Sequence, residues 1–348
     1  MKELAITVLL TLSAASPALA QAATPTPPDA QTLLERARRA HGLAALSALQ
    51  GAHLRYEQGY LNNRGEFANL YAFTENLDFA AKRLKVDRRG VLDRVESEIL
   101  IEPNRAQGWS WDYQAQSSSP VRDSSAEERD ANIWDLYFGV FGLRLGPDVR
   151  ENLRLLGPQT WLGQAGTAFS NKLAGQEVTL LIGDDGTLLA ERDSSGNTYR
   201  YLDYRLQDGL RFPFAAKLYD PAGKLVVVGR VRELRLNPIF SASDFNLASQ
   251  PFQALPFANR SFGFRAQPAD LEQLSGYTLS PATPIAPGSA AGQAGLQVGD
   301  SVVSVNGENV EGRPYSEIYD KIRTLEKVTL GVRRAGQSAP ITVVLERQ

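Results

Sequence analysis

The sequence of 348 residues contains no cysteine and only two histidines, His41 and His53. Without cysteine the chain can form neither a disulfide nor a thiolate nucleophile. Two histidines without cysteine partners do not match the ligand spacings of known zinc sites, so structural roles are favoured for both. We therefore expect neither a metal nor a cofactor.

The chain also lacks an excess of charge of one sign, since 37 Lys and Arg residues stand against 39 Asp and Glu residues. This balance removes the electrostatic argument for nucleic-acid binding. The sequence contains no G-x-S-x-G elbow and no phosphate-binding loop. Ser289 lies in a small-residue turn, and Asp184-Asp185 lies between two glycines, as in a hairpin turn. These patterns favour a non-enzyme, with an unrecognised hydrolase site as the alternative that remains open.

Long apolar runs are missing except at the start. Residues 1–20, MKELAITVLLTLSAASPALA, place Lys2 before an apolar stretch and Ala18-Leu19-Ala20 after it. This layout is typical of a secretory signal peptide cleaved after Ala20, and the stretch is too short for a membrane anchor. Residues 21–30, QAATPTPPDA, are typical of a flexible spacer. We expect export to a bacterial periplasm and no transmembrane segment in the mature chain.

Residues 31–250 are expected to form one mainly β domain. Helical spacing from Thr32 predicts a helix that closes near Gly42. Apolar residues then alternate with polar ones in segments such as HLRYEQGY and EFANLYAF, with turn sequences such as DPAG between strands. This rhythm predicts antiparallel hairpins. It is interrupted at DANIWDLYFGVFG, which predicts a buried helix, and at 147–156, which predicts a second short helix.

The helix ending in Ala40-His41-Gly42, the repeated hairpins and the late strands YRYLDYRLQDGLRFPFAAKLYDPAGKLVVVGRVRELRLNP resemble the periplasmic LolA/LolB-like lipoprotein-sorting superfamily. The resemblance implies a curved antiparallel half-barrel, covered by helices, that holds acyl chains. It is one of pattern, so no residue of a lipid site is carried over. An aromatic group is a candidate for an apolar cavity wall, with ordinary core packing as the alternative: Trp109, Trp111, Trp134, Tyr137, Phe138 and Phe141.

The end of the chain has a different pattern. Residues 287–312, PGSAAGQAGLQVGDSVVSVNGENVEG, combine tight glycine turns, a β-branched strand and an Asn-Gly turn. A helix is predicted over 314–324 and two strands follow it. With a linker at 251–259, residues 260–348 resemble a PDZ domain, a small β-sandwich with two helices.

The PDZ resemblance implies a groove in which a peptide tail is added as a strand. The carboxylate loop would be Ser261, Phe262, Gly263 and Phe264, the strand Arg265 and Ala266, and the helix positions Tyr315, Tyr319 and Ile322. Three departures from the family pattern bear on this groove. Ser261 stands where glycine is usual, Pro268 shortens the strand, and Tyr315 stands where many members have histidine.

Two functions are consistent with these patterns. The leading hypothesis is an exported, non-enzymatic binding protein whose PDZ module recruits a protein partner through a peptide tail or strand. The alternative is a lipid or lipoprotein carrier with an apolar cavity in the N-terminal domain, docked to a partner by the PDZ domain.

Overall fold

The computed structural model describes residues 29–91, 95–103, 105–112, 117–121, 139–146, 148, 150–173, 176–247 and 261–347. The expected signal peptide and linker lie outside these residues. Asp29 and Ala30, assigned from the sequence to the spacer, instead begin a helix, because the Asp29 carboxylate accepts a hydrogen bond from the Thr32 amide at 2.6 Å. Within the described residues, no helix is long and apolar enough to cross a membrane.

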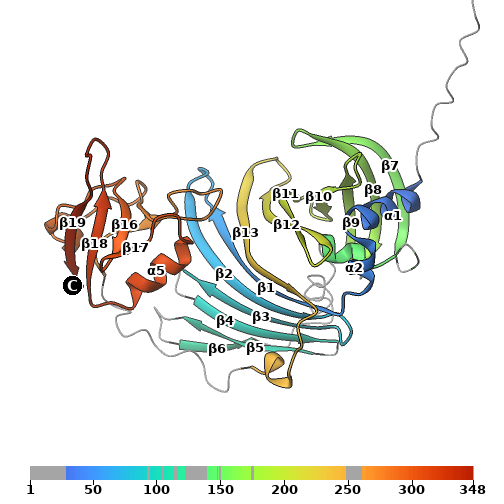
Figure 1. Ribbon diagram of the computed structural model, residues 1–348, viewed down its shortest axis with the longest axis horizontal. Helices are drawn as coiled ribbons and strands as arrows, with labels where there is room; N and C mark the ends of the chain where they lie inside the picture. Colours follow the sequence, from blue (N-terminus) through green and yellow to red (C-terminus); the bar gives the residue numbers. More distant parts are fainter. Residues whose placement is uncertain are drawn as a thin grey trace, which may run out of the picture.

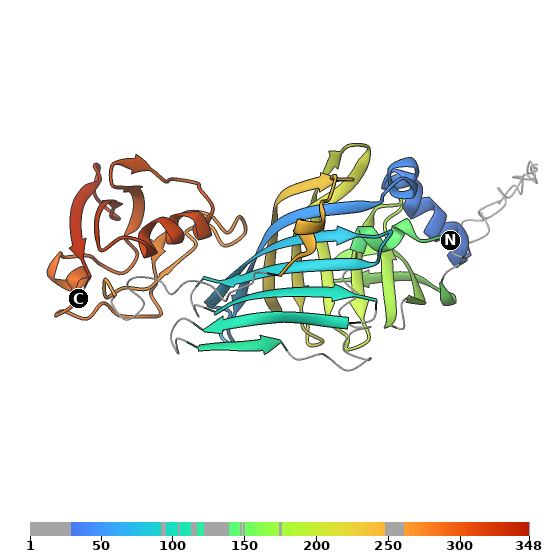
Figure 2. The same cartoon turned by 90° about the horizontal axis from the view of Figure 1, so that it is seen from below.

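The larger sheet has thirteen antiparallel strands in the order β6-β5-β4-β3-β2-β1-β13-β12-β11-β10-β9-β8-β7. It curves into an open half-barrel with β6 and β7 at its two edges, as Figures 1 and 2 show. The expected mainly β fold class is therefore confirmed. The strands are β1 (Gly51–Leu61), β2 (Phe67–Asp78), β3 (Arg83–Gly90), β4 (Val95–Glu102), β5 (Arg105–Asp112), β6 (Ser117–Val121), β7 (Glu151–Trp161), β8 (Gln164–Leu173), β9 (Gln176–Ile182), β10 (Leu188–Asp193), β11 (Thr198–Gln207), β12 (Leu210–Tyr219) and β13 (Leu225–Leu236).

Helices cover the inner face of this half-barrel at one end, where α1 (Ala30–Ala40), α2 (Leu43–Ser47) and the 3₁₀ helix η2 (Gly139–Arg144) pack on the sheet. Their apolar side chains join inward-facing strand residues in one buried core. Because strand side chains alternate between faces, Leu54 and Tyr56 of β1 point inward, whereas Glu57 points outward. A short 3₁₀ helix, η4 (Ala242–Phe245), lies outside near β3.

The Ala40-His41-Gly42 helix end fixes α1 to the sheet. The His41 ring is fully buried, donates from Nδ1 to the Arg211 carbonyl at 2.6 Å and accepts at Nε2 from the Leu188 amide at 3.0 Å. Burial lowers the pKa of His41 to about 4. Gly42 has φ of 95°, and a Cβ there would lie 2.0 Å from the Gly209 carbonyl oxygen. A structural role for His41 follows, since the neutral ring bridges α1, β10 and β12.

Two helix predictions meet different outcomes. The predicted helix at 147–156 is wrong, because 151–161 form strand β7. Leu153 and Leu155 pack against the core with Arg154 between them, so the spacing is two residues rather than three or four. The buried helix predicted near Trp134 falls mostly outside the described residues, and its end is the 3₁₀ helix η2.

The C-terminal residues form the second sheet, ordered β14-β15-β16-β18-β19, with β17 paired to β16. The helix predicted over 314–324 and the two strands after it are confirmed. The elements are β14 (Ala266–Gln267), β15 (Thr278–Leu279), α4 (Ala290–Gln293), β16 (Ser301–Val305), β17 (Glu308–Asn309), α5 (Tyr315–Arg323), β18 (Lys327–Arg333) and β19 (Ile341–Glu346).

The second sheet and its helices dock on the outer face of the half-barrel, beside β1 and β2 (Figures 1 and 2). Leu70 and Val228 of the half-barrel belong to the same buried cluster as Leu274 and Tyr315. One face of α5 makes polar contacts with the sheet: Ser316 donates to Glu57, Asp320 pairs with Arg89 at 2.5 Å, and Arg323 pairs with Glu96 at 3.5 Å. The two parts are therefore joined by apolar and ionic contacts.

Candidate functional site

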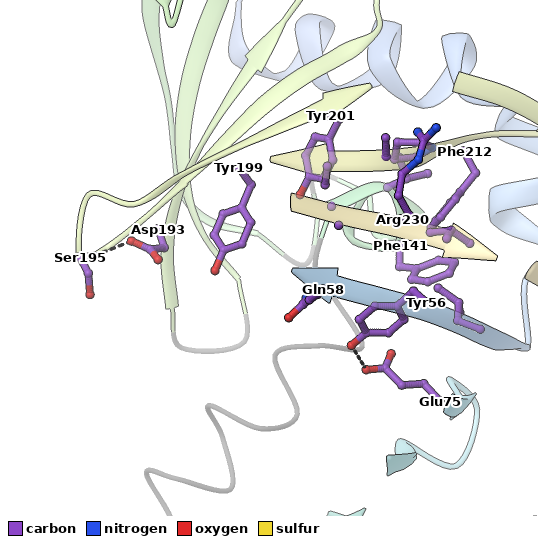
Figure 3. Close-up of a pocket in the computed structure, with 18 of the residues that line it drawn as sticks. Tyr56, Gln58, Glu75, Phe141, Asp193, Ser195, Tyr199, Tyr201, Phe212 and Arg230 are labelled. Carbon is purple, nitrogen blue, oxygen red and sulfur yellow. Dashed lines mark hydrogen bonds between the residues drawn. The ribbon is translucent and has the colours of Figure 1, made fainter. Parts of the chain in front are cut away.

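A cavity of about 450 Å³ opens on the inner face of the half-barrel. Its walls come from β1, β11, β12, β13 and η2, which the fold brings together from distant parts of the sequence. Figure 3 shows aromatic side chains around it. The largely apolar part of the lining comprises Leu54, Tyr56, Val140, Phe141, Tyr199, Tyr201, Phe212, Pro213, Ala215, Ala216 and Val231.

Gly229 lies in this lining, at mid-strand in β13. The nearest heavy atom to a Cβ built at this position is the Ala216 carbonyl oxygen at 3.6 Å, an ordinary contact distance. A glycine within a strand is typical of a place where a ligand or another backbone approaches closely. The absent side chain thus leaves space in the cavity that a larger residue would occupy.

Two carboxylates at the cavity accept hydrogen bonds from tyrosine hydroxyls. The Tyr56 hydroxyl donates to the Glu75 carboxylate at 2.6 Å, as the dashed line in Figure 3 shows. Deeper in the wall, Glu191 accepts hydrogen bonds from the Gly139 amide at 3.0 Å and from the Tyr201 hydroxyl at 3.2 Å. Burial raises the pKa of Glu191 to about 7. This polar support holds the wall in place while leaving an apolar surface toward the cavity.

The candidate cavity residues from the sequence divide into three groups. Phe141 lines the cavity. Trp109 and Trp111 stand opposite Glu98 and Glu96 in the strand register, so they share the outer face with these acids, away from the cavity. Trp134, Tyr137 and Phe138 lie outside the described residues.

Sequence reasoning missed the other walls of the cavity. Tyr199 and Tyr201 carried a signal, because two tyrosines spaced by two residues share one face of a strand. Ala216 and Gly229 gave no such signal, because a small residue indicates a cavity only once the structure shows that the residue lines one. Among the described residues, no group of three or more His, Asp or Glu side chains gathers in a way that could hold a metal ion.

The PDZ groove residues are brought together by the second sheet. Phe262 and Phe264 stack at 6.3 Å between ring centroids, and Tyr315 stacks on Tyr319 at 6.2 Å. Tyr315 and Ile322 are buried, whereas Tyr319 and Phe264 are half-buried. Of these aromatic side chains, only Phe264 and Tyr319 are therefore partly open to a ligand between the loop and the helix.

Two hydrogen bonds occupy backbone groups that a peptide ligand would use. The Gly263 amide donates to the hydroxyl of exposed Ser261 at 2.8 Å, within the predicted carboxylate loop. The Tyr315 hydroxyl donates to the Ala266 carbonyl at 2.9 Å. Arg265, which is exposed, turns its carbonyl the other way, toward the Ser280 amide on the β15 side. Because alternate peptide groups face opposite edges, the Ala266 carbonyl is the groove-edge acceptor.

Ser289 has a structural place. Its hydroxyl caps α4, accepting from the Gly292 amide at 3.2 Å and donating to the Ala286 carbonyl at 2.7 Å. Its Cβ also lies 2.1 Å from where a Cβ on Gly263 would stand, and Gly263 has φ of 82°. The carboxylate loop and α4 are therefore packed so closely that only glycine fits at 263.

Residues 282–334 match the family model of the PDZ domain. A comparison with curated proteins found no match. Among solved structures, the chain is similar to a LolA superfamily protein from Nitrosomonas europaea, with 14% identity, 63% of this chain and 98% of that chain covered, and a TM-score of 0.42. It is similar to a DUF1329 family protein from Desulfovibrio piger, with 12% identity, 62% and 95% coverage, and a TM-score of 0.42.

The chain is also similar to the HtrA3 PDZ domain bound to a phage-derived ligand, with 24% identity, 26% of this chain and 86% of that chain covered, and a TM-score of 0.22. Likenesses at these identities and scores assign no ligand. The chain thus carries a C-terminal PDZ domain, and it has structural neighbours in the LolA/LolB-like superfamily over about 62% of its length.

Proposed function

We propose that this protein is an exported, non-enzymatic carrier whose half-barrel holds the apolar chain of a lipid or lipoprotein. The cavity of about 450 Å³ carries this proposal. Its volume falls in the range of roughly 300–1,000 Å³ found for small-molecule sites, and its walls are mainly aromatic and aliphatic. A single apolar chain gains free energy along such a wall, at about 0.8 kcal/mol for each buried CH₂ group.

Native mass spectrometry of the full-length protein, purified from its own periplasm, tests the carrier. We expect bound acyl species on the wild type and at least a tenfold lower fraction on Gly229→Leu, because that side chain would enter the cavity. Gly229→Ala is the matched control and should retain more ligand than the leucine variant. A wild-type protein that carries no acyl species, or a Gly229→Leu variant that carries as much, would contradict the proposal.

The PDZ domain is proposed as the contact with a protein partner, with residues 31–250 and 260–348 acting as two domains. The half-exposed rings of Phe264 and Tyr319 support an apolar ligand side chain in the groove. The bonds at Gly263 and Ala266 shorten the backbone edge available to a peptide. An internal strand or a short tail therefore suits the groove better than a long tail anchored by its carboxylate.

A C-terminal peptide library and an internal-strand library, screened against the full chain, test the groove. Tyr319→Asp places a charge against the apolar pocket and should weaken any retained peptide by tenfold or more. Glu317→Asp on the exposed side of α5 is the control and should have no effect. Retention of the same peptides by Tyr319→Asp, or of none by the wild type, would leave α5 as a docking element only.

A further inference from the structure

A second hollow, of about 530 Å³, lies on the inner face of β1, β2 and β3. Seven residues line it: Tyr56, Gln58, Tyr60, Asn69, Tyr71, Phe73 and Arg88. Tyr56 and Gln58 also line the apolar cavity, so the two spaces lie next to each other. Along β1 the inward-facing residues change from Leu54 in the core, through these two shared residues, to Tyr60 in the hollow.

Arg88 gives the hollow its charge. On β3, the outward-facing Lys85 and Arg89 are paired with Glu98 at 2.6 Å and Asp320 at 2.5 Å. Arg88 points inward instead, with its guanidinium 4.2 Å from the Tyr71 ring centroid. In the described part of the chain it has no acidic partner, and its buried Nε has no hydrogen-bond partner. A half-buried cation stacked on an aromatic ring but unpaired with an acid is suited to receive an anion.

Gln58, which lines the hollow beside Arg88, offers further donors. The Gln58 side-chain oxygen accepts from the Tyr60 hydroxyl at 2.9 Å, which directs the Gln58 amide N–H groups to the open space. Burial raises the pKa of Tyr60, and the nearby Arg88 charge acts in the opposite direction. The carboxylate of Glu75 lines the apolar cavity rather than the hollow, and it accepts a hydrogen bond from the Tyr56 hydroxyl. A cationic group would be repelled here, and a hydrocarbon would leave these donors unused.

We infer that this hollow binds the anionic, phosphate-bearing headgroup of an amphiphile whose acyl chain occupies the adjoining cavity. The Arg88 guanidinium would bind the phosphate oxygens through its N–H groups while stacked on Tyr71. Gln58 would donate to the same headgroup from the wall that both spaces share. This inference rests on the proposed function, in which the cavity holds an acyl chain, and it adds that the ligand carries an anionic phosphate headgroup.

Titration calorimetry on the full-length protein tests it with two short-chain lipids that share their acyl chains. Dihexanoylphosphatidylglycerol has a net negative charge, whereas dihexanoylphosphatidylcholine has none. We expect the wild type to bind the anionic lipid at least tenfold more tightly. Arg88→Leu should reduce this ratio to within twofold, and Arg88→Lys should keep it above threefold. Glycerol phosphate alone should bind at least a hundredfold more weakly than the anionic lipid.

Each remaining outcome decides between the headgroup site and the acyl cavity. An unchanged lipid preference in Arg88→Leu, or no preference in the wild type, overturns the headgroup site. Full affinity for glycerol phosphate overturns the inference that the ligand's acyl chain occupies the adjoining cavity. If Gly229→Leu binds both lipids as the wild type does while Arg88→Leu loses the preference, the acyl cavity is overturned and the headgroup site stands. If neither lipid binds the wild type, both are overturned.

Discussion

The two ends of the half-barrel's inner face are built differently, although the same strands run through both. At the end covered by α1, α2 and η2, apolar side chains form a buried core next to the apolar cavity, and buried polar groups such as His41 and Glu191 are hydrogen-bonded. At the other end, Tyr60, Tyr71 and Arg88 border a hollow. A closed end whose buried His41 and Glu191 are hydrogen-bonded stabilises the fold, whereas an open end with a cation that has no acidic partner among the described residues is suited to binding. Substitutions at the two ends should therefore differ in kind.

The largest loss of stability is expected for His41→Ala at the closed end. It leaves the Leu188 amide and the Arg211 carbonyl without their partner in a buried place and opens a cavity. The loss should be about 3–4 kcal/mol, measured by urea unfolding. His53→Ala is the matched control, because His53 is half-buried and, in the part of the chain that the structure describes, its ring bonds only to Asn76, so the substitution should cost less than about 1 kcal/mol. Equal losses would contradict the assignment.

The pH dependence of the closed end comes next in size. The pKa of His41, 6.5 when exposed, is lowered to about 4 in the fold. The unfolded chain therefore takes up the proton first, and stability is lost as the pH falls below 6.5. The pKa of Glu191, 4.5 when exposed, is raised to about 7. Its contribution is fully present below pH 4.5 and is lost as the pH rises through 7. Each effect amounts to about 2 kcal/mol between pH 7 and 5, with opposite sign.

The two groups should thus cancel, and wild-type stability should be nearly flat between pH 7 and 5. Glu191→Gln removes one side of the balance, so this variant should lose about 2 kcal/mol on acidification over that interval. Urea unfolding at several pH values measures this. A flat profile for Glu191→Gln would show that one of the two buried groups titrates elsewhere.

The parts of the fold that the sequence predicts are those determined by residues close together in the chain. The PDZ domain is recognisable in the sequence because each of its tight turns depends on one or two residues. Gly295, Gly299 and Asn306-Gly307 all have positive φ. The hairpins of the half-barrel are likewise predicted from short turn sequences. At the closed end, the sequence predicts the end of α1 at Ala40-His41-Gly42, where the structure shows a close contact that only glycine allows.

The cavity could not be predicted, because it depends on register between strands far apart in the sequence. Whether Trp109 faces in or out is a matter of parity in β5, and a shift by one residue would reverse it. Tyr56 and Val231 become neighbours only when β1 pairs with β13. The sequence predicts a helix over 147–156, where the structure has strand β7, because Pro147 suits a first helical turn. Leu153, Leu155 and Leu156 fit both helical and strand spacing over so short a run.

An intermediate effect is expected where the half-barrel meets the PDZ domain. Glu57 is 3% exposed, accepts from the Arg232 guanidinium at 2.9 Å and from Ser316, and so ties β13 and α5 to β1. Glu57→Gln removes the charge that balances Arg232 and should cost about 2 kcal/mol in urea unfolding. It should also speed proteolytic release of the PDZ domain. Glu233→Gln, in an exposed ion pair with Arg235, should change stability by less than about 0.5 kcal/mol. Equal behaviour of the two variants would show that Glu57 does not join the domains.

The smallest change in stability is expected at the open end, for Arg88→Leu. It breaks no ion pair in the described part of the chain, and the loss of the contact with Tyr71 is offset by removal of a buried Nε that has no partner. The change should be within about 0.5 kcal/mol in urea unfolding. The neighbouring Arg89→Leu serves as the comparison, because it removes one of the two arginines paired with Asp320, whose pKa burial already raises, and leaves only Arg323. That variant should lose about 1 kcal/mol or more. A loss in Arg88→Leu as large as in Arg89→Leu would mean that Arg88 supports the fold as its neighbours do, and the open end would then be no different in kind from the closed one.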